Sequence, residues 1–289
     1  MKCEAIYANR ALYSVAKMCE VLEVKQCIYY QWLRNEAKRR ERKEKEQELV
    51  EKVVNVFEEN MRLYGCRKMR EALKKEGIEI SEWKTRKIMR ENGLYPEIIS
   101  KNNPYKQKEK CEREYSENKV KREFTPEDQN KVWAGDITYI QTNIGWTYLA
   151  VVLDLKNKEV IGYEVNINID TELTRRALGN AIALRGRHEG LIFHSDRGSQ
   201  YSSKRYKKML AENGITGSMS APGCPYDNSC VESFFASLKK ELVYKKNYAT
   251  IEEVKADIYR YIELFYNRKR LHSSLGYMSP VEYRLAMCS

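Results

Sequence analysis

The sequence lacks a long hydrophobic run, and this absence limits where the protein can work. Its longest apolar stretch, YLAVVLDL at residues 148–155, contains an acid and is far shorter than the ~20 apolar residues of a membrane-spanning helix. The first ten residues, MKCEAIYANR, form no hydrophobic signal core. We therefore expect no membrane association and a cytoplasmic location.

The sequence also lacks the usual signs of a zinc site or a disulfide framework. It contains no CxxC pair, and its three histidines are not spaced to complete a zinc site. We expect free thiols in a reducing cytoplasm for its eight dispersed cysteines. These are Cys3, Cys19, Cys27, Cys66, Cys111, Cys224, Cys230 and Cys288.

Acidic residues are in deficit, and the excess of basic residues is uneven. The 289 residues carry a net charge of +11, from 52 Lys and Arg against 41 Asp and Glu. Residues 1–125 hold +8 of this charge, with 30 basic and 22 acidic side chains. A basic front half indicates a polyanionic partner, because each neutralised phosphate releases counterions.

A helix-turn-helix pattern occupies the start of this basic half. In SVAKMCEVLEVKQCIYYQWLR, apolar residues recur at helical spacing on both sides of a turn near Val24. Lys25 and Gln26 then open the predicted recognition helix, although an ordinary helical hairpin fits the same pattern. A mixed-charge helical spacer follows, with an amphipathic end that includes Val53 and Phe57.

A second helix pair follows the spacer. The first helix is expected to stop at Gly77, and Ser81 is expected to cap a second helix that Gly93 closes. We expect that second helix to bury Trp83 with its other large apolar residues. Its outward basic face would contact DNA through Lys84, Arg86, Lys87 and Arg90.

The amino-acid composition and pattern of the sequence change after Pro126. Three segments rich in β-branched and aromatic residues, within 131–167, read as consecutive antiparallel strands, and helices then alternate with two further strands up to residue 220. This order predicts an α/β fold, a mixed five-stranded sheet flanked by helices, as in ribonuclease-H-like proteins. The expected domains are 1–60 (helix-turn-helix and spacer), 61–96 (second helix pair), 97–125 (charged linker) and 126–289 (sheet domain).

Three acids fall at informative places in this layout. Asp136 lies within the first strand, Asp196 ends the fourth, and Glu232 lies near the start of the following helix. The first and fourth strands are neighbours in such a sheet, and residues 219–227 would bring the helix across them. Alone, each acid has an ordinary explanation as an edge residue, a turn cap or a helix N-terminal charge. Together they indicate a Mg²⁺ or Mn²⁺ site, because clustered carboxylates stay ionised only beside a cation.

The sequence motifs around these acids resemble those of a known family. VWAGDITYI, FHSDRGSQY, SMSAPGCPYDNSCVESFFASLKKE and YNRKRLHSSLGYMSPVEY are similar to the second-reading-frame transposase of the IS-three family of bacterial insertion sequences. YSVAKMCEVLEV and YGCRKMREALKKEGIEI resemble its helix-turn-helix segments, so the likeness spans nearly the whole chain. The 35 residues between Asp196 and Glu232 also match the DDE triad of retroviral-type integrases and transposases.

The resemblance assigns roles to individual residues. It implies that Asp136, Asp196 and Glu232 bind two Mg²⁺ or Mn²⁺ ions, which would assist an in-line displacement at phosphorus. It also implies that Lys239, seven residues after Glu232, contacts the DNA end.

Two further motif positions are matched by His194 and Asn228. We expect His194 to act as a supporting residue behind the acids. We expect Asn228 to act mainly as the N-cap of the helix that carries Glu232.

The implied activity is DNA transposition in two steps. Hydrolysis at the terminus of the element exposes a 3′-hydroxyl, which then attacks a phosphodiester at the other end or in target DNA. The implied partners are the terminal inverted repeats, target DNA and further copies of the chain on DNA, within the bacterial nucleoid. The family often joins an upstream-frame DNA-binding protein to this one, and the chain itself has no heptad segment. It departs from the family at Glu23, where the turn often has glycine.

Two other functions fit part of the sequence. A non-catalytic regulator derived from a transposase would use the helix pairs alone, and the intact triad argues against it. A nuclease acting on RNA–DNA hybrids would share the sheet, but the helix pairs and the words around Glu232 disfavour it.

Overall fold

The computed structural model describes residues 1–98, 126–220 and 228–287. The chain forms two compact units. The helical unit comprises Met1–Met61 and Met69–Tyr95, and the sheet unit comprises Arg62–Lys68 and Pro96–Ser289. Most of the expected linker, 97–125, lies outside the described residues, as do residues 221–227 before the helix of Glu232.

The first helix pair forms as expected at the start of the helical unit. Helices α1 (Lys2–Ala8) and α2 (Val15–Val21) pack against the start of α3 (Gln26–Glu59) around buried Ile6, Cys19 and Tyr29. The turn between α2 and α3 holds Glu23 at φ 53°, a left-handed conformation that glycine adopts without steric cost. Lys25 is the N-cap of α3.

Helix α3 differs from the expected arrangement because it is continuous. The predicted recognition helix and the predicted spacer are two parts of one 34-residue helix. No glycine or proline interrupts this stretch, so no residue ends the first part. The predicted amphipathic end is confirmed, since Val53 and Phe57 are fully buried.

The ends of the helices in the second pair, and the Ser81 cap, are as predicted. Helix α4 (Cys66–Lys75) ends before Gly77, which has φ 78°, and α5 (Glu82–Glu91) ends before Gly93, which has φ 65°. The Ser81 hydroxyl accepts a hydrogen bond from the Lys84 amide at 3.2 Å, as an N-cap does.

The prediction that Trp83 is buried is wrong. The residue is 71% exposed, and the Lys87 ammonium lies 5.7 Å from its ring centroid. The buried face of α5 instead holds Thr85, Ile88 and Met89. Trp83 precedes Thr85 by two residues, about 200° around the helix, and therefore lies on the basic side.

The sheet unit contains the predicted mixed five-stranded sheet, in the order β3-β2-β1-β4-β5. Strands β1, β2 and β3 are antiparallel, and β4 and β5 continue the sheet in parallel from β1. The strands are β1 (Val132–Thr142), β2 (Gly145–Asp154), β3 (Val160–Asn166), β4 (Ile192–Ser195) and β5 (Thr216–Met219). This topology is that of a ribonuclease-H-like fold.

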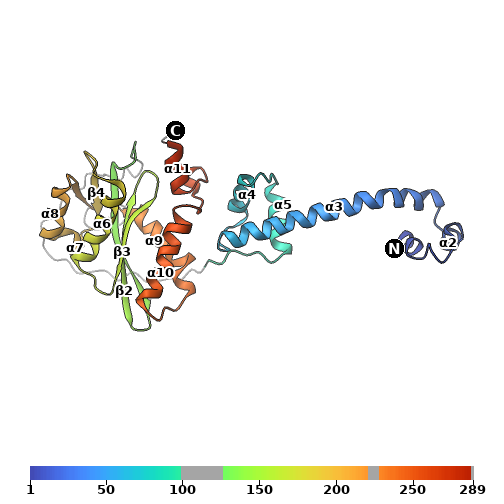
Figure 1. Cartoon of the computed structure of the whole chain (residues 1–289), viewed down its shortest axis with the longest axis horizontal. Helices are drawn as coiled ribbons and strands as arrows, with labels where there is room; N and C mark the ends of the chain where they lie inside the picture. Colours follow the sequence, from blue (N-terminus) through green and yellow to red (C-terminus); the bar gives the residue numbers. More distant parts are fainter. Residues whose placement is uncertain (99–125, 221–227, 288–289) are drawn as a thin grey trace. The chain divides into compact units, whose positions relative to one another are not determined.

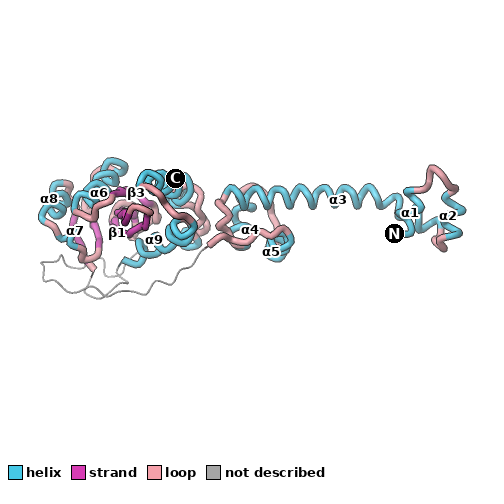
Figure 2. Tube along the Cα trace, turned by 90° about the horizontal axis from the view of Figure 1, so that it is seen from below, coloured by secondary structure: helices cyan, strands magenta, loops and turns pink. Residues whose placement is uncertain are grey.

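Helices cover both faces of the sheet (Figures 1 and 2). One face packs against α6 (Thr171–Arg185), α7 (Ser199–Ser202) and α8 (Lys204–Glu212). The other faces α9 (Ser229–Glu241), α10 (Ile251–Tyr259) and α11 (Pro280–Met287). A core cluster joins Trp133 and Phe193 of the sheet to Leu173 and Leu178 of α6.

The final helix ends earlier than the sequence pattern indicates. A helix is expected over 251–270, whereas α10 passes into a π-helical segment, η3 (Arg260–Tyr266), and stops there. The following Asn267 side chain accepts from the amide of Val160 and donates to its carbonyl, at 3.0 and 2.9 Å. Asn180 of α6 donates to the carbonyl of Tyr163 at 2.9 Å. Two asparagines therefore satisfy backbone groups on edge strand β3.

A buried ion pair fixes the C-terminal end of α9. Glu241 receives a two-point contact from Arg270, at 2.6 and 2.9 Å, and a hydrogen bond from the Tyr261 hydroxyl at 2.8 Å. Both charged side chains are about nine-tenths buried, with exposed fractions of 12% and 9%. The adjacent Leu271 amide donates to Tyr64 Oη at 2.9 Å.

The helices and cysteines of the described residues agree with two expectations from the sequence. In the part of the chain that the structure describes, no helix combines the length and apolar composition of a membrane span. Five cysteines in this part are free thiols, as expected, and the other three lie outside it.

Loss of the Arg270 charge is expected to destabilise the sheet unit strongly. Arg270→Met keeps much of the side-chain volume but leaves the Glu241 carboxylate buried without its cation, which typically costs about 3–5 kcal/mol. Urea unfolding measures the loss. Arg268→Met, at an exposed position of the same segment, is the control and should cost less than about 0.5 kcal/mol. Equal effects of the two substitutions would contradict the assignment.

His272 is expected to make stability depend on acidity. Its Nε2 is buried with no hydrogen-bond partner, and burial together with the positive charges of Arg270, Lys68 and Lys158 lowers its pKa to about 3. Between pH 6.5 and 3 the unfolded chain takes up a proton that the folded chain does not. The free energy of unfolding therefore decreases as the pH is lowered.

The expected loss from His272 is about 2 kcal/mol between pH 6.5 and pH 5. Denaturant unfolding of wild type and His272→Asn over this range measures it, and the variant should show the smaller slope. His188→Asn in the same unit is the control. Parallel curves for wild type and His272→Asn would overturn the prediction.

Candidate active site

Two of the predicted acids each follow the last paired residue of two neighbouring strands, Asp136 within β1 and Asp196 after the end of β4. The parallel register of β1 and β4 pairs Ala134 with His194 and Gly135 with Ser195. Asp136 and Asp196 are the next residue along each chain segment. Paired strands run about 4.8 Å apart, and registered residues project to the same face. We therefore expect the two carboxylates to lie close together, and their joint role stays a prediction.

Local hydrogen bonds hold both carboxylates. Asp136 is half-buried, and its Oδ1 accepts from the amide of Ile137 at 2.8 Å. Asp196 is exposed, and its Oδ1 accepts from the amide of Gly198 at 2.9 Å. A Cβ at Gly198 would lie 2.8 Å from that oxygen, so only glycine fits there without a shift. The turn after β4 is thus shaped around the Asp196 carboxylate.

Packing behind the acids also depends on a glycine. A Cβ on Gly135, the residue before Asp136, would lie 2.4 Å from the Phe193 ring. Phe193 in turn packs against Tyr201, which is buried beneath the turn that follows Asp196. Burial raises the pKa of the Tyr201 hydroxyl well above its ordinary value, and the negative charges of Asp136 and Asp196 add to this rise. Sequence reasoning missed this tyrosine, although it closes the motif HSDRGSQY.

His194 lies behind the acids as expected, on β4. It is completely buried, and its ring nitrogens contact the hydroxyls of Ser218 at 2.9 Å and Ser220 at 3.2 Å. These contacts tie β4 to β5 and its following residue. Its supporting role in catalysis stays a prediction.

The expectation that the Asn228 side chain caps α9 is wrong. Asn228 occupies the N-cap position but its side chain makes no capping hydrogen bond. Its Nδ2 instead donates to the carbonyl of Gly135, at a long 3.4 Å, and its Oδ1 is buried without a partner. The side chain of Asn228 is thus bound to a carbonyl of β1 and does not cap the helix. As a result, the start of α9 is attached to β1 at the residue before Asp136.

Glu232 lies one turn into α9, four residues after Asn228, so both project from one side of the helix. The side chain is half-buried, and burial raises the pKa of its carboxyl group. Over residues 1–98, 126–220 and 228–287, no three His, Cys, Asp or Glu side chains are grouped closely enough to hold a metal ion. The joint action of Glu232 with the two aspartates therefore stays a prediction.

Lys239 follows on the same helix and faces the sheet. Its ammonium lies 4.5 Å from the ring centroid of Tyr139 on β1. Burial lowers the pKa of this ammonium, and the negative charge of Asp136 opposes the effect. Its charge is thus within electrostatic reach of the Asp136 carboxylate. The contact with Tyr139 was not foreseen from the sequence.

The predicted DNA-binding residues of the helical unit lie on two helices. Lys25 and Gln26 are exposed at the start of α3. On α5, Arg86 and Arg90 are exposed and Lys84 and Lys87 are half-buried. Arg86 contacts Glu82 at 2.8 Å, and Lys87 lies 3.9 Å from Glu91. A basic surface is therefore present on α5, with its charge partly balanced by acids of the same helix.

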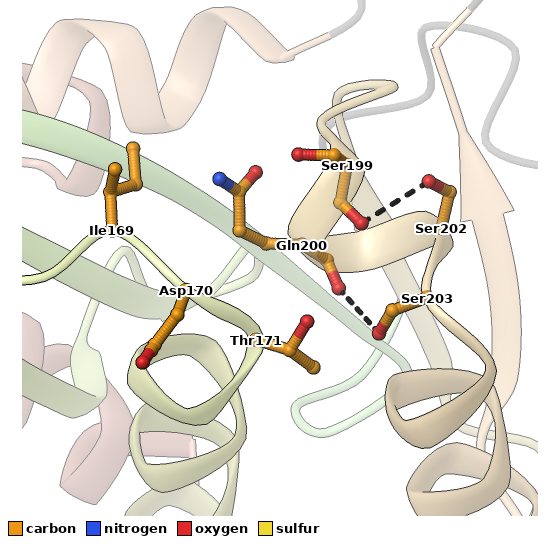
Figure 3. A pocket seen from close by; sticks show the side chains of 7 residues that line it. All are labelled: Ile169, Asp170, Thr171, Ser199, Gln200, Ser202 and Ser203. Carbon is orange, nitrogen blue, oxygen red and sulfur yellow. Dashed lines mark hydrogen bonds between the residues drawn. The ribbon is translucent and has the colours of Figure 1, made fainter.

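A pocket of about 430 Å³ lies between the start of α6 and the residues around α7 (Figure 3). It is lined by residues 169–171 at the start of α6 and by side chains around α7. Its hydroxyls serve local turns, since Ser202 donates to the Ser199 carbonyl and Ser203 to that of Gln200. Its one carboxylate, Asp170, caps α6. None of the three predicted metal ligands lines this pocket, so it is not the candidate reaction site.

Comparison with known proteins agrees with this layout. Residues 126–225 and 232–286 match two families described as Integrase core domain, and residues 44–100 match an HTH-like domain. The transposase InsF for insertion sequence IS3A of Escherichia coli (strain K12) is 35% identical over 283 residues, which cover 98% of each chain. The transposase for insertion sequence element IS904 of Lactococcus lactis subsp. lactis (strain IL1403) is 37% identical over 81% of this chain and 92% of that protein.

Among solved structures, a chain of a simian T-cell lymphotropic virus intasome matches with a TM-score of 0.46 and 19% identity. The match covers 74% of this chain and 69% of that one. The family is shown by the sequence relatives, which this protein matches along nearly its whole length. The chain therefore belongs to the IS3-type insertion-sequence transposases, DNA-binding polynucleotidyl transferases of the DDE type that carry an integrase core domain.

Proposed function

We propose that this transposase cuts and joins DNA at the ends of its insertion sequence, with Asp136, Asp196 and Glu232 as the reacting acids. The observation that supports the proposal is the register of β1 and β4, whose last pair, Gly135 and Ser195, directly precedes the two aspartates. The attachment of the α9 start to Gly135 supports the inclusion of Glu232.

The donor set fits divalent cations. Carboxylate oxygens are the hard ligands that Mg²⁺ and Mn²⁺ prefer, and two neighbouring carboxylates favour a cation between them. Two such ions, when bound, would activate the attacking oxygen and stabilise the departing one. The chain's own part is to hold the ligands, through the amides of Ile137 and Gly198, on elements that the sheet core fixes.

The proposed reaction has two steps. Water first attacks the phosphodiester at the terminus of the element, and a 3′-hydroxyl leaves. That hydroxyl then attacks a second phosphodiester, at the other end of the element or in target DNA, and the displaced strand departs with its own 3′-hydroxyl. Neither step needs a covalent bond between protein and DNA. Lys239 would contact a phosphate of the DNA end.

DNA recognition would be divided between the two units. We propose that Lys25 and Gln26, together with the basic surface of α5, read or track the terminal inverted repeats. The proposed domain division is 1–60, 61–96, 97–125 and 126–289. Since two ends must be joined, copies of the chain would act together on DNA at the nucleoid, with or without fusion to an upstream-frame DNA-binding protein.

Substitution of either aspartate is expected to abolish chemistry but spare binding. Asp136→Asn and Asp196→Asn each remove a cation ligand, so cleavage and strand transfer should fall by at least about a hundred-fold. A labelled element end incubated with Mg²⁺ or Mn²⁺ measures both steps, and a gel shift measures binding. Asp128→Asn, at an exposed position of the same unit, is the control.

The same assay distinguishes the regulator hypothesis. Wild-type protein that binds the ends but never cleaves them, even with the upstream-frame protein supplied, would indicate a non-catalytic DNA-binding role. Cleavage that survives in Asp196→Asn would exclude this carboxylate from the reaction.

Loss of a basic side chain on α5 is expected to weaken DNA binding uniformly. Arg90→Ala removes an exposed charge, so the slope of log affinity against log salt should become shallower by about one, whatever the DNA sequence. Fluorescence anisotropy over a range of salt concentrations measures the slope. Lys52→Ala, an exposed lysine of α3, is the control. An unchanged slope for Arg90→Ala would remove this residue from the DNA surface.

A further inference from the structure

The hairpin of β1 and β2 carries exposed aromatic side chains beyond the strand position of Asp136. Tyr139 is 49% exposed and Trp146 is 50% exposed. The register pairs Tyr139 with Tyr148 and Gln141 with Trp146, so the two exposed rings are diagonal neighbours on one face. Their centroids are 5.2 Å apart, edge to face. We call these two residues the aromatic platform.

The platform stands on a hairpin whose tip is anchored. The Thr142 hydroxyl donates to the Gly145 carbonyl at 2.8 Å, which closes the turn. The Asn143 amide donates to the carbonyl of Tyr248 at 2.8 Å, and Thr142 forms a parallel bridge with the same residue. The rings are therefore presented by a fixed element, so little ordering would be needed when a ligand binds.

A positive charge lies against the platform and links it to the acids. The Lys239 ammonium is 4.5 Å from the Tyr139 centroid, on the helix that carries Glu232. Tyr139 follows Asp136 by three residues on β1, a rise of about 10 Å. The pairing of β4 with β1 stops at Gly135, so the edge of β1 is open to Lys239 beyond it. Because successive side chains of a strand point to opposite faces, Tyr139 and Asp136 lie on opposite faces of the sheet, and Lys239 is the group that lies near both.

This combination fits a nucleobase and its phosphate better than an apolar protein surface. Every base offers a flat face that stacks on aromatic rings, and the attached phosphate pairs with a lysine. A base can stack on these rings only where it is unpaired, as when the end of the duplex is opened beside the cut. A surface that receives a displaced base would offset the cost of opening the end.

We propose that Tyr139 and Trp146 stack an unpaired base next to the scissile phosphodiester, while Lys239 contacts the adjoining phosphate. The proposal rests on the proposed transposase function and adds a base-binding site to it.

The experiment compares intact and abasic DNA ends. The full chain is assayed by single-turnover cleavage of the duplex that ends its own element, and by end binding in the Asp196→Asn background. Abasic residues are placed one at a time at the positions that flank the cut. Trp146→Ala should slow cleavage and weaken binding of intact ends by about ten-fold. At one abasic position, wild type should fall to the level of Trp146→Ala, which should not fall further.

Matched variants separate stacking from loss of structure. Trp146→Phe and Tyr139→Phe keep an aromatic face and should retain at least half of wild-type cleavage. Tyr259→Ala removes an exposed tyrosine of α10 in the same unit, 53% exposed, and should have no effect. Thermal melting of each variant verifies that it folds.

Each remaining outcome counts against the platform. If Trp146→Ala cleaved more slowly than wild type by the same factor on intact ends and at every abasic position, stacking would be excluded. A change in oligomeric state by light scattering, with unchanged DNA binding, would instead assign the surface to a second copy of the chain. If wild type is active and Trp146→Ala is equally active, only this inference is refuted. If wild type neither cleaves nor binds the ends, the proposed function is refuted too.

Discussion

The parallel pairing of β1 with β4 is the constraint on which the candidate site depends. Asp136 lies inside a strand whose neighbours are buried, and Asp196 follows a strand that is buried almost throughout. The β1–β4 pairing ends at the residues before these two acids, so β1 is not paired with β4 beyond Gly135. Gly135 and Gly198 contribute by their lack of a side chain, which lets Phe193 pack behind the acids and lets a carboxylate oxygen accept a backbone amide.

Helix α9 is held at both ends, and this explains how residues on it can be aimed at the sheet. Its start is attached to β1 through Asn228, and its end is locked by the ion pair of Glu241 and Arg270. Between these points lie Glu232 and Lys239, two turns apart on one side. The motif YNRKRLH therefore has a structural role here. Arg270 contacts Glu241 at the end of α9, and Asn267 contacts Val160 of β3.

Much of this could be predicted because it is written in local patterns. The strand order, the placement of Asp136 and Asp196, and the caps at Ser81 and Gly93 follow from residue type and spacing. Trp83 is exposed although it is hydrophobic, because it shares a helix side with Lys87, and its position in the helix decides its burial. The unbroken run from Gln26 to Glu59 likewise already indicated a single helix.

Other features depend on contacts between residues far apart in the chain, which spacing does not encode. The pairing of Arg270 with Glu241 and the approach of Lys239 to Tyr139 arise only once the helices dock on the sheet. Asn228 is a sharper case, because its residue type favours a cap and the tertiary structure offers its amide a strand carbonyl instead. The relation of Glu232 to the aspartates belongs to this class as well.

The two asparagines on β3 have a consequence for how copies of the chain can meet. An exposed sheet edge invites a strand from another molecule, which would extend the sheet by backbone hydrogen bonding. Asn267 and Asn180 already occupy the backbone positions at Val160 and Tyr163 that such a strand would use. A strand from another molecule would therefore have to displace both asparagine side chains before it could extend the sheet at β3.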